Sequence, residues 1–320
     1  MRTFIIDTDT ASDDAVALIM ALRHPDVRVA AITVVAGNVP LEQATRNALY
    51  AAELCGACDV PVYSGAARPL VRPAADAQWF HGKDGLGDQN YPPAKIKARP
   101  EHAVDALIRT IHANPGCTLV TLGPLTNVAV ALSRDPGIAK HVARCVIMGG
   151  NPCCEGNVTP AAEYNIWCDP EAARIVLHSG MPIELVGWQL CRGEANLNEA
   201  DIAAVRKLNT PLAHFAIDCN RVAMEANRTQ SGEIGIALPD PIAMAIALEP
   251  SICTDASSHR VEIETASELT RGMTVVDRLN VASDGRNRGV WNDAGGNAIS
   301  VCWAIDISRW KQLLVRSLSE

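Results

Sequence analysis

The sequence has few aromatic residues and no excess of positive charge. Only three Phe, four Tyr and six Trp occur among 320 residues, and 28 Lys and Arg are outnumbered by 36 Asp and Glu, giving a formal net charge of −8. Neutralisation of a phosphate backbone requires a basic surface, so a general nucleic-acid-binding role is excluded. The chain also has no uninterrupted apolar run of the roughly 18 residues that a membrane span needs. We therefore expect neither a nucleic acid nor a membrane as a partner.

Neither the start of the chain nor its cysteines indicate secretion. Residues 1–3 lead into a short apolar stretch that meets acidic residues at once, so we expect no signal peptide and a cytoplasmic protein. In that compartment the 11 cysteines are expected to be reduced thiols and not a disulfide framework. Cys55 and Cys58 match a CxxC pattern, but no second such pair or nearby His pair completes a zinc site. We interpret them as small apolar side chains.

Apolar runs alternate with helical periodicity over the first 190 residues or so. Strands are expected at residues 3–6, 27–35, 60–63, 117–122, 145–148 and 183–186, with helices at 15–22, 41–54, 103–112, 126–132 and 170–177. Farther on we expect helices at 199–208, 210–227 and 241–248, then a strand at 298–307 and a helix at 308–317. Such alternation predicts an α/β fold with an open, largely parallel sheet covered by helices on both faces.

The stretch 67–100 contains several Pro and Gly residues and is too long for an ordinary connection. Loops of this size in α/β proteins often cover an active site. The sequence therefore predicts a lid over residues 67–100.

Four acidic residues follow the first predicted strand: Asp7, Asp9, Asp13 and Asp14. In an open α/β sheet, ligands bind beyond the carboxyl ends of the strands, where these residues fall. Helix capping can explain one or two acids at a helix start, but four crowded carboxylates repel one another unless a cation or protons intervene. A hard divalent cation with oxygen ligands is the simplest explanation.

Two enzyme families have a cluster of this kind. Residues 7–10 nearly match the Asp-Xaa-Asp-Xaa-Thr motif of haloacid-dehalogenase-like phosphatases, but in that family the second acidic pair comes much later in the chain. The full pattern instead resembles the inosine–uridine-preferring nucleoside hydrolases, which carry an N-terminal Asp-Xaa-Asp-Xaa-Xaa-Xaa-Asp-Asp. Further matches follow in family order at residues 37–39, 81–87, 122–127, 148–150, 156–157, 162–165, 169–172 and 238–241. The resemblance implies a single domain over residues 1–320 with a Rossmann-like sheet, a mobile lid and a helical C-terminal portion.

The resemblance also implies roles for individual residues. Calcium would be held by Asp9, Asp14, Asp240 and the backbone carbonyl of Leu122, a set of oxygen donors that suits this ion. Asp9 would also be the general base that takes a proton from the attacking water. Asp13 would accept a hydrogen bond from a ribose hydroxyl, and Asp7 would support the cluster.

The sugar pocket is implied in the same way. Asn38, which is also counted among the catalytic residues, would bind the ribose together with the following residues: Asn157, Glu163, Tyr164 and Asn165. Met148 would pack against the ribose, and His81, within the predicted lid, would act on the substrate. Cleavage of an N-glycosidic bond develops positive charge on the sugar, which carboxylate and amide oxygens favour.

The base side departs from the family pattern. Many members carry a histidine immediately before the late aspartate to protonate the leaving base, whereas Pro239 stands here and cannot donate a proton. The acid would have to come from His81, from Tyr164, from a water or from a thiol of Cys153 or Cys154. Aromatic stacking can also activate a purine, with candidates at Trp79, Trp188 and Trp291. Residues 186–191 differ from the family pattern as well.

We therefore expect calcium-dependent hydrolysis of free ribonucleosides, with a purine preference suggested by the number of tryptophans. Two alternatives remain: hydrolysis of a modified nucleoside or another N-riboside, and a catalytically inactive nucleoside-binding protein. The resemblance implies a homodimer or homotetramer.

Overall fold

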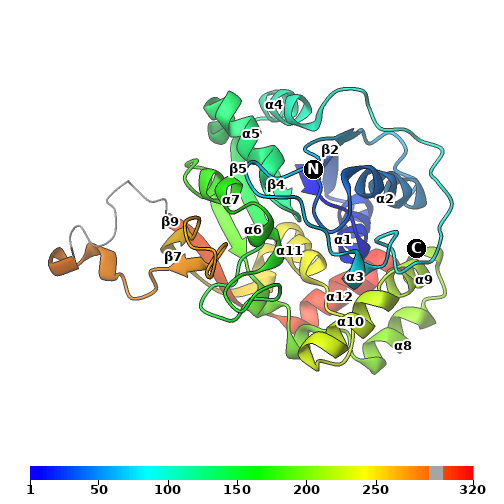
Figure 1. Cartoon of the computed structure of the whole chain (residues 1–320). Helices are drawn as coiled ribbons and strands as arrows, with labels where there is room; N and C mark the ends of the chain where they lie inside the picture. Colours follow the sequence, from blue (N-terminus) through cyan, green and yellow to red (C-terminus); the bar gives the residue numbers. More distant parts are fainter. Residues whose placement is uncertain (288–297, 320) are drawn as a thin grey trace.

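The computed structural model describes residues 1–287 and 298–319, in which nine strands form one sheet covered by helices (Figure 1). The strands are β1 (Arg2–Thr8), β2 (Val27–Val34), β3 (Val62–Ser64), β4 (Cys117–Thr121), β5 (Val142–Met148), β6 (Ile183–Val186), β7 (Cys253–Ile263), β8 (Thr274–Val276) and β9 (Ala298–Ile305). Their order in the sheet is β3-β2-β1-β4-β5-β6-β9-β7-β8. From β3 to β9 neighbouring strands pair in parallel, as the alternation of elements predicted.

The helices occupy the connections between strands. They are α1 (Ser12–Arg23), α2 (Leu41–Leu54), α3 (Gln78–His81), α4 (Ala103–Ala113), α5 (Thr126–Arg134), α6 (Tyr164–Cys168), α7 (Pro170–Leu177), α8 (Glu199–Lys207), α9 (Pro211–Asp218), α10 (Arg221–Ser231), α11 (Pro239–Leu248) and α12 (Ile307–Leu318). Most of the helices expected from periodicity are present, with ends displaced by a few residues.

Alternating side chains of β1 separate two apolar layers. Phe4 and Ile6 belong to one buried cluster with α1, α2, α11 and α12, whereas Ile5 belongs to a second cluster with α4, α5 and α7. All three side chains are fully buried. Both faces of the central strands are therefore covered, which explains why these strands read as near-continuous apolar runs.

The far edge of the sheet was not predicted. β7 pairs antiparallel with β9, and β8 pairs antiparallel with β7. Most residues in the first half of β7 are exposed, so this strand lacks the apolar pattern from which strands are recognised.

The expectation of reduced thiols throughout was wrong at one pair. Cys253 of β7 and Cys302 of β9 form a disulfide between neighbouring strands. The other nine cysteines, all within the described residues, are free, including Cys55 and Cys58. The pairing gave no signal in the sequence because one of its two strands was not recognised.

The helix predicted over residues 210–227 is in fact two helices. α9 ends at Asp218 and α10 begins at Arg221, with Asn220 as the residue that precedes the second helix. The Asn220 side-chain amide donates to the carbonyl of Ala216 (Nδ2–O 2.9 Å), so this polar side chain competes with helix continuation at the break. The break brings α10 against α3. Within the described residues, no helix is long and apolar enough to cross a membrane.

Candidate active site

The acidic cluster lies where the direction of strand order reverses. The chain passes from β1 to β2 and β3 on one side of the sheet, and then returns to place β4 on the other side of β1. A crevice opens at such a reversal beyond the carboxyl ends of the strands. Asp7 lies in β1 and Asp9 follows its end, whereas Asp13 and Asp14 lie in the first turn of α1. Asp240 reaches the same place from the first turn of α11.

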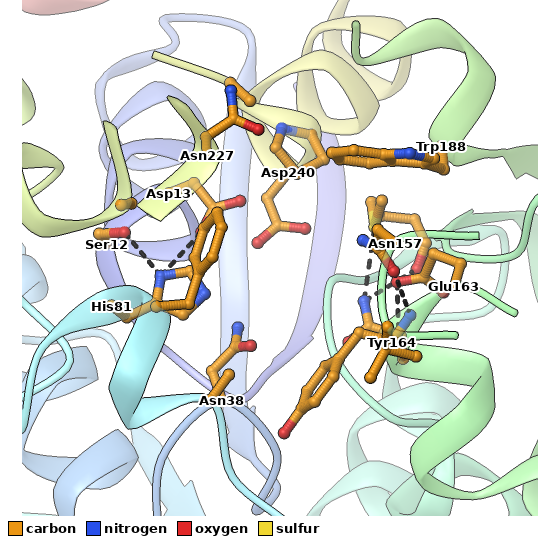
Figure 2. Close-up of a pocket in the computed structure, with 18 of the residues that line it drawn as sticks. Ser12, Asp13, Asn38, His81, Asn157, Glu163, Tyr164, Trp188, Asn227 and Asp240 are labelled. Carbon is orange, nitrogen blue, oxygen red and sulfur yellow. Dashed lines mark hydrogen bonds and ion pairs between the residues drawn. The ribbon is translucent and has the colours of Figure 1, made fainter. Parts of the chain in front are cut away.

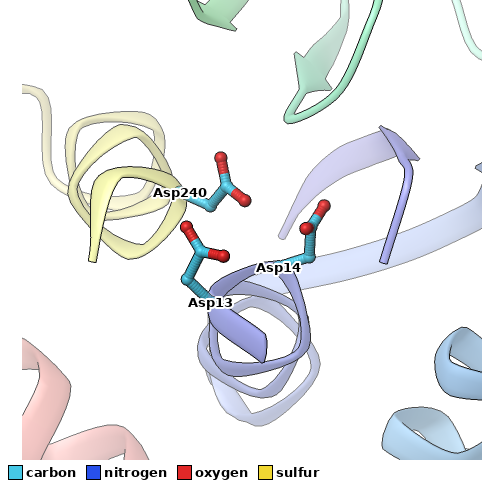
Figure 3. A group of neighbouring side chains, drawn as sticks. All are labelled: Asp13, Asp14 and Asp240. Carbon is cyan, nitrogen blue, oxygen red and sulfur yellow. The ribbon is translucent and has the colours of Figure 1, made fainter. Parts of the chain in front are cut away.

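Three carboxylates converge in this crevice (Figure 3). One oxygen each from Asp13, Asp14 and Asp240 can be chosen so that all lie within 4.8 Å of one another, although all three residues are buried. Burial and the charge of Asp14 raise the pKa of Asp13 to about 7. Burial and the neighbouring charges of Asp14, Asp13 and Asp9 raise the pKa of Asp240 well above its ordinary range. The cluster therefore resists carrying its full negative charge in the absence of a counter-ion.

The hydrogen bonds of the cluster leave some oxygens unpaired. Asp14 accepts from the Thr8 hydroxyl (Oγ1–Oδ1 2.5 Å), from the Ala11 amide (N–Oδ2 3.0 Å) and from the Asn38 side chain (Nδ2–Oδ2 3.3 Å). Oδ1 of Asp9 and Oδ1 of Asp13 are buried without a hydrogen-bond partner among the described residues. Buried carboxylate oxygens of this kind are costly unless a cation meets them.

The residues present fit a hard divalent cation. The donors available are carboxylate oxygens and the carbonyl of Leu122, which already accepts a hydrogen bond from Asn165 (Nδ2–O 2.8 Å) and retains a second lone pair. Oxygen-only donors suit calcium or magnesium and do not suit softer metals. The three converging carboxylates include Asp13 in addition to the predicted ligands Asp14 and Asp240. Asp9, the third predicted carboxylate ligand, lies next to them, because the charge of Asp14 contributes to raising the pKa of Asp9.

Asp9 is held between two glycines. The backbone amide of Asn38 donates to Asp9 (N–Oδ2 2.6 Å), which fixes one carboxylate oxygen. A Cβ at Gly37 would lie 2.1 Å from Oδ2 of Asp9, and one at Gly123 would lie 2.5 Å from Oδ1. Only glycine fits at either position. The two motifs that contain these glycines therefore serve to position a single carboxylate.

Asp7 has a different environment. It accepts from the Thr33 hydroxyl (Oγ1–Oδ1 2.6 Å) and from the Asn127 amide (Nδ2–Oδ1 2.9 Å). Burial raises its pKa to about 7. Asn127 also donates to the carbonyl of Val34 (Nδ2–O 3.0 Å), so Asp7 joins β1, β2 and α5 behind the cluster.

A cavity of about 280 Å³ lies in front of the acids. Its lining includes all seven residues predicted to bind substrate, namely Asp13, Asn38, Met148, Asn157, Glu163, Tyr164 and Asn165, together with Leu122 and Asp240 (Figure 2). Asp9 and Asp14 do not line the cavity and lie behind it, fully buried.

The wall of the cavity opposite His81 is built around the start of α6 (Figure 2). Glu163 caps this helix by accepting from the amides of Asn165 (N–Oε1 2.8 Å) and Ile166 (N–Oε2 3.2 Å). It also accepts from the Gly150 amide in the loop after β5 (N–Oε2 2.8 Å). Asn157 accepts from the Tyr164 amide (N–Oδ1 2.9 Å), and the Tyr164 hydroxyl donates to the carbonyl of Gly37 (Oη–O 3.0 Å). These side chains are thus held in place by backbone groups before any substrate binds.

His81 comes from the segment predicted as a lid, which remains a prediction. Residues of this segment that line the cavity are Ala75, Asp76, Ala77, Trp79, Phe80 and His81. His81 lies at the C-terminal end of α3, and its Nδ1 is hydrogen-bonded to the Ser12 hydroxyl (2.8 Å). Burial lowers the pKa of His81 to about 3.

Comparison with known proteins identifies the family and the fold. The model of the family described as "Inosine-uridine preferring nucleoside hydrolase" matches residues 4–312. The chain belongs to this family. The sequence is 37% identical over 320 residues to a pyrimidine-specific ribonucleoside hydrolase RihA of Shewanella sp., covering 99% of this chain and 96% of the relative.

Solved structures give the same result. A plant nucleoside hydrolase, PpNRh1, superposes with a TM-score of 0.89 at 32% identity, covering 99% of both chains. A purine-preferring ribonucleoside hydrolase from Gardnerella vaginalis superposes with a TM-score of 0.87 at 29% identity, covering 99% of this chain and 98% of the other. The chain is thus an N-glycosyl hydrolase with the nucleoside hydrolase fold, acting on ribonucleosides.

The structure argues against two of the residues considered as proton donors to the leaving base. Cys153 and Cys154 were considered as proton donors, but they line a separate hollow with residues 273–276 and not the substrate cavity. Burial raises the pKa of Cys154 to about 11, so its thiol is also a poor acid. Trp188 and Trp79 do line the cavity, whereas Trp291 lies outside the described residues. Pro239 also lines the cavity.

Several residues of the site were not anticipated. Ser12 lines the cavity. So do three residues on or just before α10, namely Asn220, Asn227 and Gln230. Asn227 is one of the labelled lining residues (Figure 2), and its Nδ2 is buried without a hydrogen-bond partner among the described residues. Asn227 and Ala223 are spaced four residues apart on one helix face, but the sequence gave no indication that this face meets the cavity.

Proposed function

We propose that this enzyme hydrolyses the N-glycosidic bond of ribonucleosides in a calcium-dependent reaction, with purine nucleosides as the preferred substrates. The observation that carries the proposal is a cavity whose lining includes the carboxylates of Asp13, Asp240 and Glu163 and the amide of Asn38. A ribose placed there meets carboxylate and amide oxygens on several sides. Such a lining favours the oxocarbenium-like sugar of the transition state over the neutral ground state.

Calcium would be held by Asp14, Asp240, Asp9 and the Leu122 carbonyl. Its positive charge would orient the sugar hydroxyls and polarise the attacking water. Asp9 is suited to accept the proton from that water, because its Oδ1 is free of hydrogen-bond partners among the described residues. Its other oxygen is fixed by the Asn38 amide. One carboxylate can therefore be held in position and still act as a base.

The ribose would be oriented by the pre-arranged wall of α6. Asn157, Glu163 and Asn165 are already held by backbone hydrogen bonds, so binding costs little further side-chain entropy. Met148 also lines the cavity, and its flexible side chain would pack against the sugar.

The proposed purine preference is supported by the aromatic rings at the base end. Trp188 is buried and Trp79 is 60% exposed at the rim of the cavity. Aromatic walls on this end favour a large flat base and its protonated form. The related RihA is described as pyrimidine-specific and the Gardnerella hydrolase as purine-preferring, so base preference varies among similar proteins.

The test is steady-state kinetics with inosine, adenosine, guanosine, uridine and cytidine in the presence of calcium. The proposal expects ribose and free base from these substrates, with higher kcat/KM for the purine nucleosides. Higher kcat/KM for uridine and cytidine would overturn the purine preference alone. Absence of ribose from all five while calcium is bound would overturn the assignment to common nucleosides.

A modified nucleoside or another N-riboside is the second candidate substrate. The observation that favours it is Pro239 in the cavity lining, which also includes the polar side chains of Asn227 and Gln230. A base end without the histidine of many relatives could accept a base that leaves without strong acid assistance. Binding of ribonucleosides without turnover would instead indicate a nucleoside-binding protein. We further propose a homodimer or homotetramer, which light scattering of the purified protein tests.

A further inference from the structure

Ser12 and His81 form a buried pair at the edge of the cavity. Ser12 begins α1 and His81 ends α3, and their side chains are joined by a hydrogen bond (Oγ–Nδ1 2.8 Å). His81 is 7% exposed, Ser12 is fully buried, and both line the cavity. In Figure 2 His81 lies between Ser12 and the interior of the cavity. The lid segment is thus attached to the acidic motif through this contact.

The hydrogen bond has a preferred direction. The ring nitrogen Nδ1 is the only hydrogen-bond partner of the Ser12 hydroxyl among the described residues. The nearest Asp13 oxygen is 3.9 Å from Nδ1, which is too long for a hydrogen bond. A buried hydroxyl that keeps its hydrogen unpaired loses free energy, so the hydroxyl donates and Nδ1 accepts. An accepting Nδ1 places the ring hydrogen on Nε2 and leaves the ring neutral.

Nε2 is then a donor without a partner. It makes no hydrogen bond to any described residue, and it belongs to a side chain that lines the cavity. Pro239 cannot donate, and the Tyr164 hydroxyl is engaged by the carbonyl of Gly37. His81 is accordingly the best-placed donor for a group bound at this side of the cavity.

We propose that Ser12 is a positioning residue that holds His81 as a neutral Nε2–H donor toward an acceptor atom of the leaving base. The proposal rests on the proposed function. When the N-glycosidic bond breaks, its electron pair passes to the base, and the negative charge spreads to a ring nitrogen or carbonyl oxygen. The Nε2–H hydrogen bond stabilises that charge without giving up its proton. The water that adds hydroxide to the sugar supplies the proton that the base finally gains.

Nitrogen NMR of the histidine-labelled protein tests the positioning without any turnover. His81 is assigned with a His81→Asn variant, and its two nitrogen shifts distinguish the tautomers. We expect Nε2 to be protonated and Nδ1 to be an acceptor in the wild-type protein. The Ser12→Ala variant should shift the tautomer population, whereas Ser12→Thr, which keeps the hydroxyl, should retain it. Protonation of Nδ1 in the wild type, or an unchanged tautomer in Ser12→Ala, would overturn the proposal.

Kinetics with two substrates test the role toward the base. A 4-nitrophenyl riboside has a leaving group that needs no hydrogen-bond assistance, whereas a natural nucleoside does. We expect the ratio of kcat/KM for inosine to kcat/KM for the riboside to fall about tenfold in Ser12→Ala and to recover in Ser12→Thr. Ser133→Ala, which removes a hydroxyl from α5 outside the cavity, is the matched control.

The two tests separate the possible failures. An equal loss on both substrates in Ser12→Ala would show a general structural role and overturn the inference. If the wild-type protein cleaves neither substrate, the proposed function fails, and the NMR experiment still decides whether Ser12 fixes the His81 tautomer.

Discussion

Gly37 and Asp9 are so close that no other residue fits at position 37. A Cβ there would lie 2.1 Å from Oδ2 of Asp9, which is the oxygen that accepts the Asn38 amide hydrogen. The backbone of the loop after β2 at Gly37 is therefore in direct contact with the carboxylate of Asp9, which follows β1. The position of the proposed general base depends on the absence of a side chain from the neighbouring loop.

Replacement of Gly37 by alanine should therefore displace Asp9. We expect kcat/KM to fall at least 100-fold, because a catalytic group misplaced by about 1 Å loses effect on this order. Gly285→Ala is the control, since a Cβ there meets nothing within 4 Å. Nucleoside kinetics and circular dichroism of both variants measure the effect. A folded Gly37→Ala enzyme with wild-type activity would contradict the proposed importance of this contact.

Asp9→Asn should remove the proposed base while keeping the size of the side chain. General-base catalysis contributes roughly 10²- to 10⁴-fold, so we expect kcat to fall about 1,000-fold. The Asn side-chain oxygen can still accept the Asn38 amide hydrogen, so substrate affinity should change less than kcat. A reducing-sugar assay with inosine measures the loss. Asp59→Asn, at an exposed aspartate, should leave the rate unchanged.

Removal of calcium should reduce both activity and stability. Four buried acids would lose their counter-ion, and a ligand at 100 times its Kd stabilises by about 2.7 kcal/mol. We expect EGTA to lower the Tm by about 5 °C and calcium to restore it. Thermal unfolding of wild type and Asp240→Asn with and without calcium checks this. A variant that still responds fully to calcium would show that Asp240 is not a ligand.

Tyr164→Phe should weaken the connection between α6 and the loop after β2. The hydroxyl of Tyr164 donates to the carbonyl of Gly37, and a hydrogen bond of this kind contributes roughly 1 kcal/mol. We expect KM for inosine to rise about fivefold with kcat reduced less than twofold. Tyr91→Phe is a suitable comparison, because no described residue accepts from the Tyr91 hydroxyl. Equal effects of the two changes would indicate a role in packing only.

Asn227→Leu should alter discrimination at the base end. Asn227 lines the cavity, and its side-chain Nδ2 is buried without a hydrogen-bond partner among the described residues. A buried donor that meets a carbonyl of the base contributes to specificity, because a substrate without the acceptor leaves it unpaired. We expect kcat/KM for inosine, whose base carries a carbonyl group, to fall about tenfold. The kcat/KM for adenosine, whose base has no carbonyl group, should change little. Parallel assays with inosine and adenosine measure the difference.

Much of the sheet could be predicted because its strands are buried on both faces. β1, β2 and β4 read as apolar runs at the expected positions, and the acids after β1 follow from the rule that ligands bind at the carboxyl ends. β7 could not be predicted, since its exposed residues carry no apolar alternation. The break between α9 and α10 was missed because apolar periodicity continues across Cys219 and Asn220.

Some residues of the candidate site could likewise be predicted from the sequence, and others could not. The acids and the sugar-side residues form short local motifs, so a family resemblance could indicate them. Asn227 and Ser12 acquire their significance from contacts with residues far away in the chain: Ser12 meets His81 across 69 positions. No periodicity or short motif records such a contact. The position of Cys153 and Cys154 away from the cavity is likewise a property of how loops are placed in space.

Asp13 and Asp14 lie in the first turn of α1, and Asp240 lies in the first turn of α11, so two helices start at the same cluster of acids. The N-terminal end of a helix carries about half a positive charge from its aligned peptide dipoles. Two such ends directed at the carboxylates compensate part of their repulsion within the protein itself. The chain can thus reach its folded state before it meets a cation, and the cation then binds to a site that the backbone has already prepared.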